Sequence, residues 1–504
     1  MVLNRVLLVI FDGFGVNPNR AYNAVALAKT PNLDYYFANN SHTVIEASGI
    51  ACGLPDGQFG NSEVGHLTLG SGRILKQDLL RITESFEDGT INENPTWQKI
   101  IKENSNKRLH LIGLVSDGGV HSHIQHIIYL IKLLVKNNIE PVLHMITDGR
   151  DTPPTSAPIY LDILEKLFNK LSKGTIATVS GRYYAMDRAQ NYDRVEKAYK
   201  AIVNHEGMSA KSAKIAIEQA YARGETDEFI TPTFIEGVAP IQKDEAVLFF
   251  DFRADRMRQI VSAFGSSDFK YFKRNNVFKV YCMVEYDEKF DFDVLFKPIF
   301  PKNVLAEVIS KAGLKQFHCA EKEKYAHVTY FFNGGKEEPF DKEDRVIVPS
   351  PNVSTYDLAP QMSACEVADQ TIKAIKKHYD FIVINFANGD MVGHTAVQKA
   401  CIIAVETLDT QFNRLVKAAL EEGYNILLTA DHGNCDEMVD PITGEPHTQH
   451  TIYPVPFLII GKKYNLRTQG GICDIAPTVL DLLNLEKPSE MSGKSLLLKP
   501  TYYI

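Results

Sequence analysis

Short apolar runs alternate with longer amphipathic segments along the whole chain. The runs at residues 6–11, 381–385 and 426–430 are rich in valine, leucine, isoleucine and phenylalanine. Their length and composition are typical of buried strands, and the segments between such runs have the length of helices. This alternation predicts an α/β fold with largely parallel sheets.

Acidic and imidazole side chains follow these three runs. They are Asp12 after the first, Asp390 and His394 after the second, and Asp431 and His432 after the third. In open parallel sheets, ligands gather at the carboxyl ends of the strands. We therefore expect these side chains to lie close together, although the chain separates them by hundreds of residues.

The chemistry of this set favours two divalent metal ions. Asp390 and His394 are four residues apart, so both face the same side of a helical turn. His450, in a loop with glycine and proline, offers another imidazole. Oxygen and nitrogen ligands without thiolates suit manganese or zinc, and magnesium less well. The alternative is that each acid caps a helix and each histidine is bonded within a loop, which is harder to sustain for the whole set.

Ser62 lies in the segment 60–66, shortly after the first strand. A hydroxyl beside two metal ions can act as a nucleophile in phosphoryl transfer, because the metal lowers its effective pKa. Ser62 could instead be the N-cap of a helix. The two roles are compatible, since a helix N-terminus also stabilises a phosphorylated serine.

A second group of apolar runs, at residues 109–115, 142–146, 175–179 and 246–250, leads into loops with a different chemistry. These loops carry His121 and His123, Arg150 and Asp151, Arg182 and Arg188, and Arg253 and Arg256. The planar guanidinium grips carboxylates and phosphates with two hydrogen bonds. The arginines therefore predict a cradle for a small substrate with more than one negative charge. The alternative is salt bridging with Asp148, Asp151, Asp251 and Asp255.

Five residues of this region have more specific expectations. Arg253 and Arg256, three residues apart, are expected on one face of a helical turn, and Asp151 is expected to orient Arg150 and contact substrate hydroxyls. Either His121 or His123 is a phosphate contact, and either is equally suited to cap the following helix.

The two kinds of strand end occupy separate parts of the chain. The metal-type ends lie before residue 75 or after residue 380, whereas the arginine-type ends lie between. This separation predicts an outer domain of residues 1–75 and 300–504, which binds metal, and an inserted substrate-binding domain of residues 76–299. Prolines at 298 and 301 mark one junction as a loop.

Lys324 precedes a segment that resembles a strand in the outer domain. A lysine in a site of metals and serine can neutralise a phosphate or help to deprotonate the hydroxyl. Acidic neighbours in the segment 321–329 favour a solvated surface lysine instead.

Bulk properties exclude several classes of protein. The formal charge of −8, from 54 basic and 62 acidic residues, argues against a nucleic-acid or anionic-membrane surface. Seven scattered cysteines without a Cys-x-x-Cys pair fit a reducing cytoplasm. The first apolar run is too short for a signal peptide or a membrane span. We expect a cytoplasmic protein, most simply a monomer, with no nucleic-acid or membrane partner.

Five motifs, taken together, resemble one family. They are the segments 60–66 (GNSEVGH), 116–123 (SDGGVHSH), 148–151 (DGRD), 390–395 (DMVGHT) and 429–434 (TADHGN). From residue 8 to residue 494 the chain resembles the cofactor-independent phosphoglycerate mutases, of the alkaline-phosphatase-like metalloenzyme superfamily. The resemblance implies interconversion of 3-phosphoglycerate and 2-phosphoglycerate through a phosphoserine, without 2,3-bisphosphoglycerate.

The resemblance also implies residue roles. One metal would be held by Asp390, His394 and His450, and the other by Asp12, Ser62, Asp431 and His432. Ser62 would be the nucleophile with Lys324 beside it. The substrate would be bound by Lys324, His121, Arg150, Asp151, Arg182, Arg188, Arg253 and Arg256. The metals are expected to be Mn²⁺, although Mg²⁺, Co²⁺ and Zn²⁺ accept the same ligands.

One departure from the family pattern affects the substrate site. Asp251 stands where asparagine is expected, and it adds a negative charge beside the substrate arginines. The nearest rival functions are those of a phosphopentomutase, a phosphomonoesterase or a nucleotide pyrophosphatase. A catalytically inactive sensor of phosphoglycerate is the rival from another class.

Overall fold

The computed structural model describes residues 4–498 and divides the chain into two compact units. The outer unit comprises Met1–Gln77 and Phe300–Ile504, and the inserted unit comprises Asp78–Ile299. The first boundary therefore follows Gln77, where the sequence suggested residue 75. Each unit has its own buried hydrophobic core.

The outer unit contains a seven-stranded sheet in the order β12-β11-β13-β1-β14-β15-β2. The strands are β1 (Arg5–Phe11), β2 (Ser41–Ile45), β11 (Gln316–Glu321), β12 (Glu343–Val348), β13 (Phe381–Phe386), β14 (Tyr424–Thr429) and β15 (Val455–Ile460). The five strands from β12 to β14 pair in parallel, and β15 pairs antiparallel with both β14 and β2. The predicted α/β class with largely parallel sheets is confirmed.

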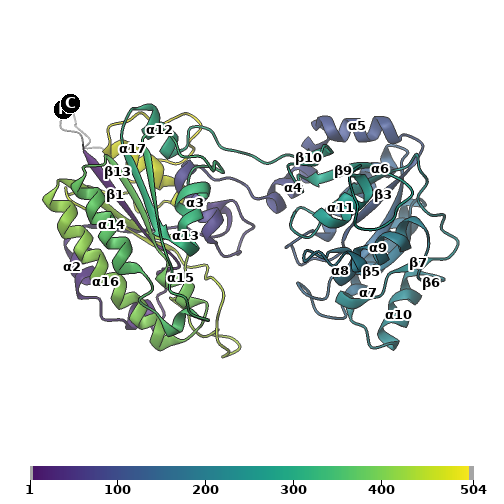
Figure 1. Ribbon diagram of the computed structural model, residues 1–504, viewed down its shortest axis with the longest axis horizontal. Helices are drawn as coiled ribbons and strands as arrows, with labels where there is room; N and C mark the ends of the chain where they lie inside the picture. The colour runs from purple at the N-terminus through teal and green to yellow at the C-terminus, as the bar shows by residue number, and fades with distance from the viewer. Residues whose placement is uncertain (1–3, 499–504) are drawn as a thin grey trace. The chain divides into compact units, whose positions relative to one another are not determined.

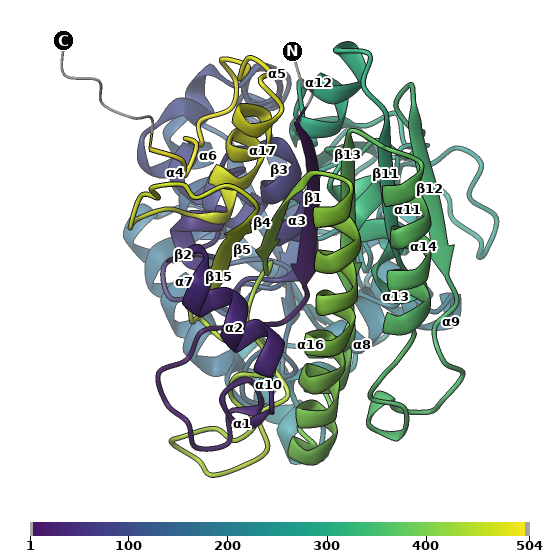
Figure 2. The same cartoon turned by 90° about the vertical axis from the view of Figure 1, so that its left-hand side faces the viewer.

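Helices cover both faces of this sheet, with α14 and α16 on the opposite side from α3 (Figures 1 and 2). The helices are α1 (Ala24–Leu27), α2 (Pro31–Asn39), α3 (Ser62–Ser71), α12 (Leu305–Lys311), α13 (Lys322–Ala326), α14 (Ala364–Lys376), α15 (Asn388–Gly393), α16 (Gln398–Glu421) and α17 (Ile475–Leu482). A π-helical turn, His327–Phe331, continues α13. Because both faces are covered, β1 and β13 are apolar along most of their length and almost fully buried.

The inserted unit contains an eight-stranded sheet in the order β10-β9-β8-β3-β4-β5-β7-β6. The strands are β3 (Arg108–Leu114), β4 (Glu140–Thr147), β5 (Thr175–Gly181), β6 (Met208–Ala210), β7 (Thr233–Ile235), β8 (Ala246–Phe249), β9 (Lys279–Val284) and β10 (Asp293–Phe296). Every pairing is parallel except that of β5 with β7.

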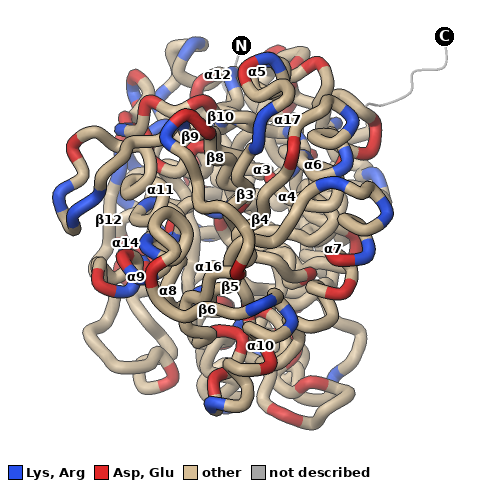
Figure 3. Tube along the Cα trace, turned by 90° about the vertical axis from the view of Figure 1, so that its right-hand side faces the viewer, with Lys and Arg blue, Asp and Glu red and all other residues tan. Residues whose placement is uncertain are grey.

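The helices of the inserted unit pack around this sheet. They are α4 (Asp78–Glu87), α5 (Pro95–Asn104), α6 (Ile124–Lys136), α7 (Ala157–Leu171), α8 (Arg182–Ala185), α9 (Tyr192–Val203), α10 (Ala213–Ala222) and α11 (Arg258–Gly265). Basic and acidic residues are interspersed over the face of this unit shown in Figure 3. Within residues 4–498, no helix combines the length and apolar character that a membrane span requires.

Candidate active site

Three acids meet at the carboxyl ends of three neighbouring strands of the outer unit. Asp12 follows β1, Asp390 lies in α15 just after β13, and Asp431 follows β14. Strand β1 lies between β13 and β14, so the parallel order brings the three carboxylates together. All three are buried. The juxtaposition expected from the sequence is present.

Ser62 is the first residue of α3, and its side chain points at these acids. The N-cap is Asn61, whose side chain accepts a hydrogen bond from Val64 N at 3.0 Å. The interpretation of Ser62 as the cap is therefore wrong. Its Oγ lies 3.1 Å from Asp12 Oδ1 and 2.9 Å from His432 Nε2.

Two glycines allow the backbone to approach the acids closely. A Cβ on Gly65, one turn into α3, would lie 2.8 Å from Asp431 Cβ. Gly13 adopts a φ of +71°, and a Cβ there would lie 2.7 Å from the Asp390 backbone. A side chain at either position would push α3 or the β1 loop away from the acids.

Lys324 is buried beside Ser62, with 3% of its surface exposed. The segment after it is helical in α13 and the π turn, so the expected strand and the surface interpretation are both wrong. Its Nζ lies 2.6 Å from Ser62 Oγ, 2.7 Å from Asp12 Oδ1 and 2.6 Å from Asp390 Oδ2. Burial alone would lower the pKa of Lys324, but Asp12 and Asp390 outweigh it and raise that pKa, so the ammonium stays charged.

His394 and His450 both direct Nε2 at Asp390. The distances to Asp390 Oδ1 are 3.1 Å from His394 and 3.0 Å from His450. On the other side of each ring, Nδ1 lies 2.8 Å from a backbone carbonyl, that of Thr448 for His394 and of Gly60 for His450. Since a carbonyl only accepts, Nδ1 carries the proton and Nε2 keeps a lone pair for a metal ion.

His432 lies between the two halves of the site. Its ring stacks on that of His450 with centroids 3.9 Å apart, and its Nε2 lies 3.5 Å from Asp12 Oδ1 and 3.4 Å from Asp431 Oδ2. Burial lowers the pKa of His432 to about 4, so the imidazole is neutral and able to ligate.

The donors form two tight groups with the composition of metal sites. One is Asp390, His432 and His450, and the other is Asp12, His66 and Asp431. This grouping differs from the expected one, because it places His432 with Asp390 and adds His66 beside Asp12 and Asp431. His432 Nε2 nevertheless also lies within 3.5 Å of Asp12 Oδ1 and Asp431 Oδ2, so it is within reach of either group. Two observations fit divalent cations. Asp431 Oδ2 is buried without a hydrogen bond, and burial followed by the charge of Asp431 raises the pKa of Asp12 to about 7. A bound cation would give the Asp431 oxygen a partner and would lower the pKa of Asp12.

Two residues of this site were missed by the sequence analysis. His66 lies one turn after Ser62 on α3, with Nδ1 2.9 Å from Ser62 O and 3.2 Å from Asp431 Oδ2. Asn385, in β13, donates from Nδ2 to Asp12 Oδ2 at 2.7 Å. The signal for His66 was its spacing of four residues from Ser62, which places both on one face of a helix.

The arginine-type residues follow four neighbouring parallel strands of the inserted unit. These strands are β8, β3, β4 and β5, and the loops or helices after them carry His121, Arg150, Asp151, Arg182, Arg188, Arg253 and Arg256. Arg182 is the buried arginine of the set, with 2% of its surface exposed. Its Nη1 lies 2.6 Å from both Asp148 Oδ1 and Asp151 Oδ2, and its Nε has no partner.

The other arginines are more exposed and already contact acids or carbonyls. The pairs are Arg188 with Asp255 at 2.7 Å, Arg253 with Asp255 at 3.1 Å, Arg150 with Glu228 at 2.8 Å, and Arg256 with the Met186 carbonyl at 3.2 Å. Burial, followed by the charges of Arg182, Arg188 and Arg150, lowers the pKa of Arg256, so these guanidinium groups share one region. Arg253 and Arg256 precede α11 and do not lie on the helix expected for them.

The two candidate histidines have different surroundings. His123 is the N-cap of α6 and accepts from Gln125 N at 3.3 Å. His121 is buried, its Nε2 lies 3.9 Å from Asp151 Oδ2, and its Nδ1 has no hydrogen bond. Burial, and then the charge of Arg182, lowers the pKa of His121 to about 4, so a neutral ring faces the arginines.

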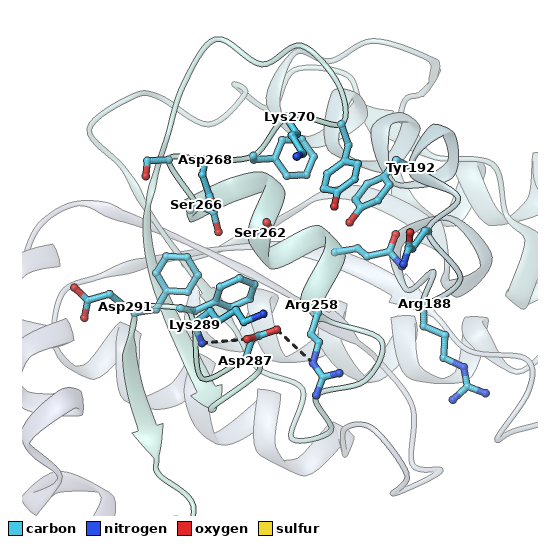
Figure 4. Close-up of a pocket in the computed structure, with 18 of the residues that line it drawn as sticks. Arg188, Tyr192, Arg258, Ser262, Ser266, Asp268, Lys270, Asp287, Lys289 and Asp291 are labelled. Carbon is cyan, nitrogen blue, oxygen red and sulfur yellow. Dashed lines mark hydrogen bonds and ion pairs between the residues drawn. The ribbon is translucent and has the colours of Figure 1, made fainter.

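An open pocket of about 820 Å³ adjoins this set within the inserted unit. Arg188 and Asp255 line it together with Arg258 and Asp287, which form a long ion pair at 3.9 Å (Figure 4). Most of the arginine set lies outside this pocket, so the pocket is not itself the predicted cradle.

Comparisons with known proteins agree with this chemistry. Residues 4–487 match the family model described as the metalloenzyme superfamily. The chain is 49% identical to the 2,3-bisphosphoglycerate-independent phosphoglycerate mutase of Clostridium novyi (strain NT), covering 98% of this chain and 100% of that protein. The protein of the same name from Symbiobacterium thermophilum is also 49% identical, over 98% of this chain and 97% of its own length.

A solved structure matches as well. It is that of Leishmania mexicana phosphoglycerate mutase at low cobalt concentration, with a TM-score of 0.68 and 33% identity, covering 99% of this chain and 98% of that one. Strand-end acids, imidazoles and a buried serine thus define a member of the metalloenzyme superfamily. Within it, the chain belongs to the family of 2,3-bisphosphoglycerate-independent phosphoglycerate mutases, and the resemblance seen in the sequence is confirmed.

Proposed function

We propose that this protein interconverts 3-phosphoglycerate and 2-phosphoglycerate without 2,3-bisphosphoglycerate, with Ser62 as the phosphate acceptor. The observation that carries the proposal is the surroundings of Ser62 Oγ, which contacts Lys324, Asp12 and His432 at 2.6, 3.1 and 2.9 Å. A serine that only caps a helix bonds to backbone N–H groups and does not require a buried lysine beside its hydroxyl. Family membership supports the same reaction.

The residues around Ser62 suit it to attack phosphorus. Lys324, held charged by its acids, donates to Oγ and stabilises the alkoxide that forms when the hydroxyl loses its proton. The first turn of α3 then offers free backbone N–H groups to the phosphoryl oxygens of the phosphoserine. The glycerate oxygen leaves and takes up the proton that Ser62 released. The other glycerate hydroxyl then gives up its proton, which returns to Ser62, as the phosphoryl group moves back and completes the isomerisation.

We assign two divalent ions to this site, with Mn²⁺ as the expected metal and Mg²⁺, Co²⁺ or Zn²⁺ as alternatives. Asp390, His394 and His450 would hold one, and Asp12, Ser62, Asp431 and His432 the other. When bound, such ions lower the pKa of the serine hydroxyl and neutralise phosphoryl oxygens. The Nε2 lone pairs of His394 and His450, which converge on Asp390 Oδ1 while Nδ1 of each ring faces a backbone carbonyl, support this assignment.

The arginine set is proposed to bind the organic part of the substrate. Arg182 carries an unpartnered Nε, and Arg150, Arg188, Arg253 and Arg256 can exchange their surface ion pairs for the carboxylate and phosphate. His121 and Asp151 are suited to the glycerate hydroxyls. Lys324 would also contact the transferred phosphoryl group.

An enolase-coupled assay tests this function. Metal-free protein receives 3-phosphoglycerate without 2,3-bisphosphoglycerate, and Mn²⁺ is then added back. Activity that returns with Mn²⁺ and disappears in Ser62→Ala supports the proposal, provided that circular dichroism shows an unchanged fold. Release of inorganic phosphate without 2-phosphoglycerate would indicate a phosphatase instead.

The remaining expectations concern the state of the protein in the cell. We infer a cytoplasmic enzyme, most simply a monomer. All seven cysteines are free, and six of them are buried, as suits a reducing compartment. Light scattering on a gel-filtration column tests the oligomeric state.

A further inference from the structure

Asn385 connects two of the groups that surround the serine. Its side chain is fully buried in β13. The amide nitrogen Nδ2 lies 2.7 Å from Asp12 Oδ2 and 3.0 Å from His66 Nε2. The amide oxygen Oδ1 is buried with no hydrogen bond. The orientation of this amide is therefore set by the two acceptors that face its nitrogen.

The orientation of Asn385 determines the tautomer of His66. A carboxylate oxygen only accepts, so Asp12 holds the NH₂ end of the amide. The second N–H then points at His66 Nε2, which has to accept. In a neutral imidazole the proton consequently sits on Nδ1. That Nδ1 donates to Ser62 O at 2.9 Å and lies 3.2 Å from Asp431 Oδ2.

This tautomer separates His66 from the metal-binding histidines. Its Nε2 lone pair is used by Asn385, and its Nδ1 carries a proton. His394 and His450 are arranged in the opposite way, with Nδ1 on a carbonyl and Nε2 facing Asp390 Oδ1. Although His66 lies near Asp12 and Asp431, it has no lone pair to offer a cation.

We propose that Asn385 and His66 form a positioning relay that orients the serine-side metal site. The relay runs from Asp12 through Asn385 to His66, and from His66 to the Ser62 carbonyl and Asp431. By holding Asp12 Oδ2, Asn385 keeps Asp12 Oδ1 directed at Ser62 Oγ and Lys324 Nζ. This inference rests on the proposed function, because it assigns the four residues Asp12, Ser62, Asp431 and His432 to one ion.

The test is titration of Mn²⁺ into metal-free protein, followed by calorimetry, with mutase kinetics alongside. Asn385→Asp is nearly isosteric, but it places an oxygen against Asp12 and lets His66 donate from Nε2. We expect one of the two Mn²⁺ binding steps to weaken by about 10–100-fold, the range for residues that orient metal ligands. The other step stays unchanged. In the assay kcat falls and KM for 3-phosphoglycerate is retained, because no arginine is altered.

Variants at His66 test the second half of the relay. In His66→Asn the side-chain NH₂ can replace the Nδ1 donor, whereas His66→Leu removes it. We expect the asparagine variant to keep most of the Mn²⁺ affinity and the leucine variant to lose it in the same binding step. Asn385→Ser provides a second variant at the other position if Asn385→Asp does not fold.

Two buried residues of the same unit serve as matched controls. Asn23 donates from its buried amide to the Asn17 and Asn19 carbonyls, and His318 contacts the Val328 carbonyl and Gln316. Asn23→Asp and His318→Leu change the thermal midpoint but leave both Mn²⁺ steps in place. They separate a loss of stability from a loss of positioning.

The outcomes distinguish the relay from the proposed function. Unaltered Mn²⁺ affinities in both Asn385→Asp and His66→Leu would overturn the relay while leaving the mutase intact. Loss of one bound ion in both His66 variants would also overturn it, since His66 would then be a ligand. If the unaltered protein itself shows no Mn²⁺-dependent mutase activity, the proposed function fails, and the relay fails with it.

Discussion

Lys324 Nζ lies 2.6 Å from Ser62 Oγ, although the two residues are 262 positions apart in the chain. The ammonium reaches the serine because α13 follows β11 directly, and β11 is the neighbour of β13 in the sheet. The same ammonium bonds Asp12 and Asp390. The Lys324 ammonium thus contacts Ser62, Asp12 and Asp390 at the same time.

Replacing Lys324 with methionine should reduce kcat by about 10²–10³-fold, the usual cost of losing one donor aimed at developing negative charge. The side-chain length is kept, so the change isolates the charge. Steady-state kinetics at saturating Mn²⁺ measures the effect. Lys322→Met, an exposed position on the same helix, is the control and should retain full activity. Equal activities for the two variants would contradict the role of Lys324.

Gly65→Ala should impair the site without changing any polar side chain. The added Cβ would lie 2.8 Å from Asp431 Cβ and 2.9 Å from Asp431 O, closer than real Cβ contacts, so α3 has to shift. A displacement of Ser62 by about 1 Å is expected to cost on the order of 10²-fold in kcat. Gly471→Ala is the control, because its nearest neighbour would lie at 3.5 Å. Turnover of Gly65→Ala at the unaltered rate would show that α3 tolerates the shift.

The strand-end residues could be predicted because local pattern and topology agree there. The runs before Asp12, Asp390 and Asp431 are unmistakably apolar, and parallel strands place their carboxyl ends together. The same logic found the loops that carry Arg150 and Arg182. In both units, a short run of buried residues determines where the next polar side chain lies.

Side-chain partners supplied by distant segments were not predictable in the same way. Lys324 follows Glu321 and Lys322 and precedes Tyr325, a context that resembles a solvated surface; its burial depends on β11 lying beside β13. In the sequence, Asn385 cannot be distinguished from the other residues of its strand. Its contact with Asp12 follows only from the pairing register of β1 and β13. Likewise, Asn61 rather than Ser62 caps α3, a difference of one residue that sequence patterns do not resolve.

Asp251→Asn should stabilise the inserted unit at neutral and alkaline pH. Asp251 Oδ1 accepts from Leu114 N at 2.8 Å, but its buried Oδ2 has no partner, and burial raises the pKa of Asp251 to about 7. A carboxyl whose folded pKa lies above its unfolded value of 3.8 destabilises the fold as pH rises through about 4 to 7. Asparagine keeps the acceptor and cannot ionise.

The expected gain for Asp251→Asn is on the order of 1–2 kcal/mol at pH 8, disappearing near pH 4. Fluorescence of Trp97, the single tryptophan of the chain, reports unfolding of the inserted unit in urea. A slightly lower KM for 3-phosphoglycerate should accompany the gain, because a negative charge near Arg182 is removed. A gain that persists unchanged at pH 4 would mean that ionisation is not the cause.

Two buried histidines should make the inserted unit sensitive to acid. His110 Nδ1 lies 2.8 Å from His144 Nε2, His110 Nε2 faces Glu245, and His144 Nδ1 faces Thr178. Burial lowers the pKa of both histidines below 6.5, well below in the case of His144, where the nearby charges of His110, His205 and Arg108 add to the effect. The folded unit therefore binds fewer protons than the unfolded chain once the pH falls below about 6.5.

The contribution of these histidines to stability is fully present above pH 6.5 and is lost as pH falls, by up to about 1.4 kcal/mol per pH unit for each histidine that stays neutral. Asp251, whose pKa burial raises to about 7, acts in the opposite direction over the same range, so the comparison is made in an Asp251→Asn background. Burial would raise the pKa of Glu245, but hydrogen bonds to His110 and Arg108 outweigh it and lower that pKa to about 2. Glu245 therefore adds a loss of stability only below its unfolded pKa of 4.5.

Urea unfolding followed by Trp97 fluorescence measures this effect between pH 7.5 and 5. The free energy of unfolding should depend on pH with a slope that His144→Gln reduces. His121 and His126, whose pKa values burial also lowers, should keep part of that slope in the variant. The control is His42→Gln, at an exposed histidine of the outer unit, which should leave the slope unchanged. If the protein with His144→Gln has the same slope as the protein without it, the buried pair already binds a proton in the folded state.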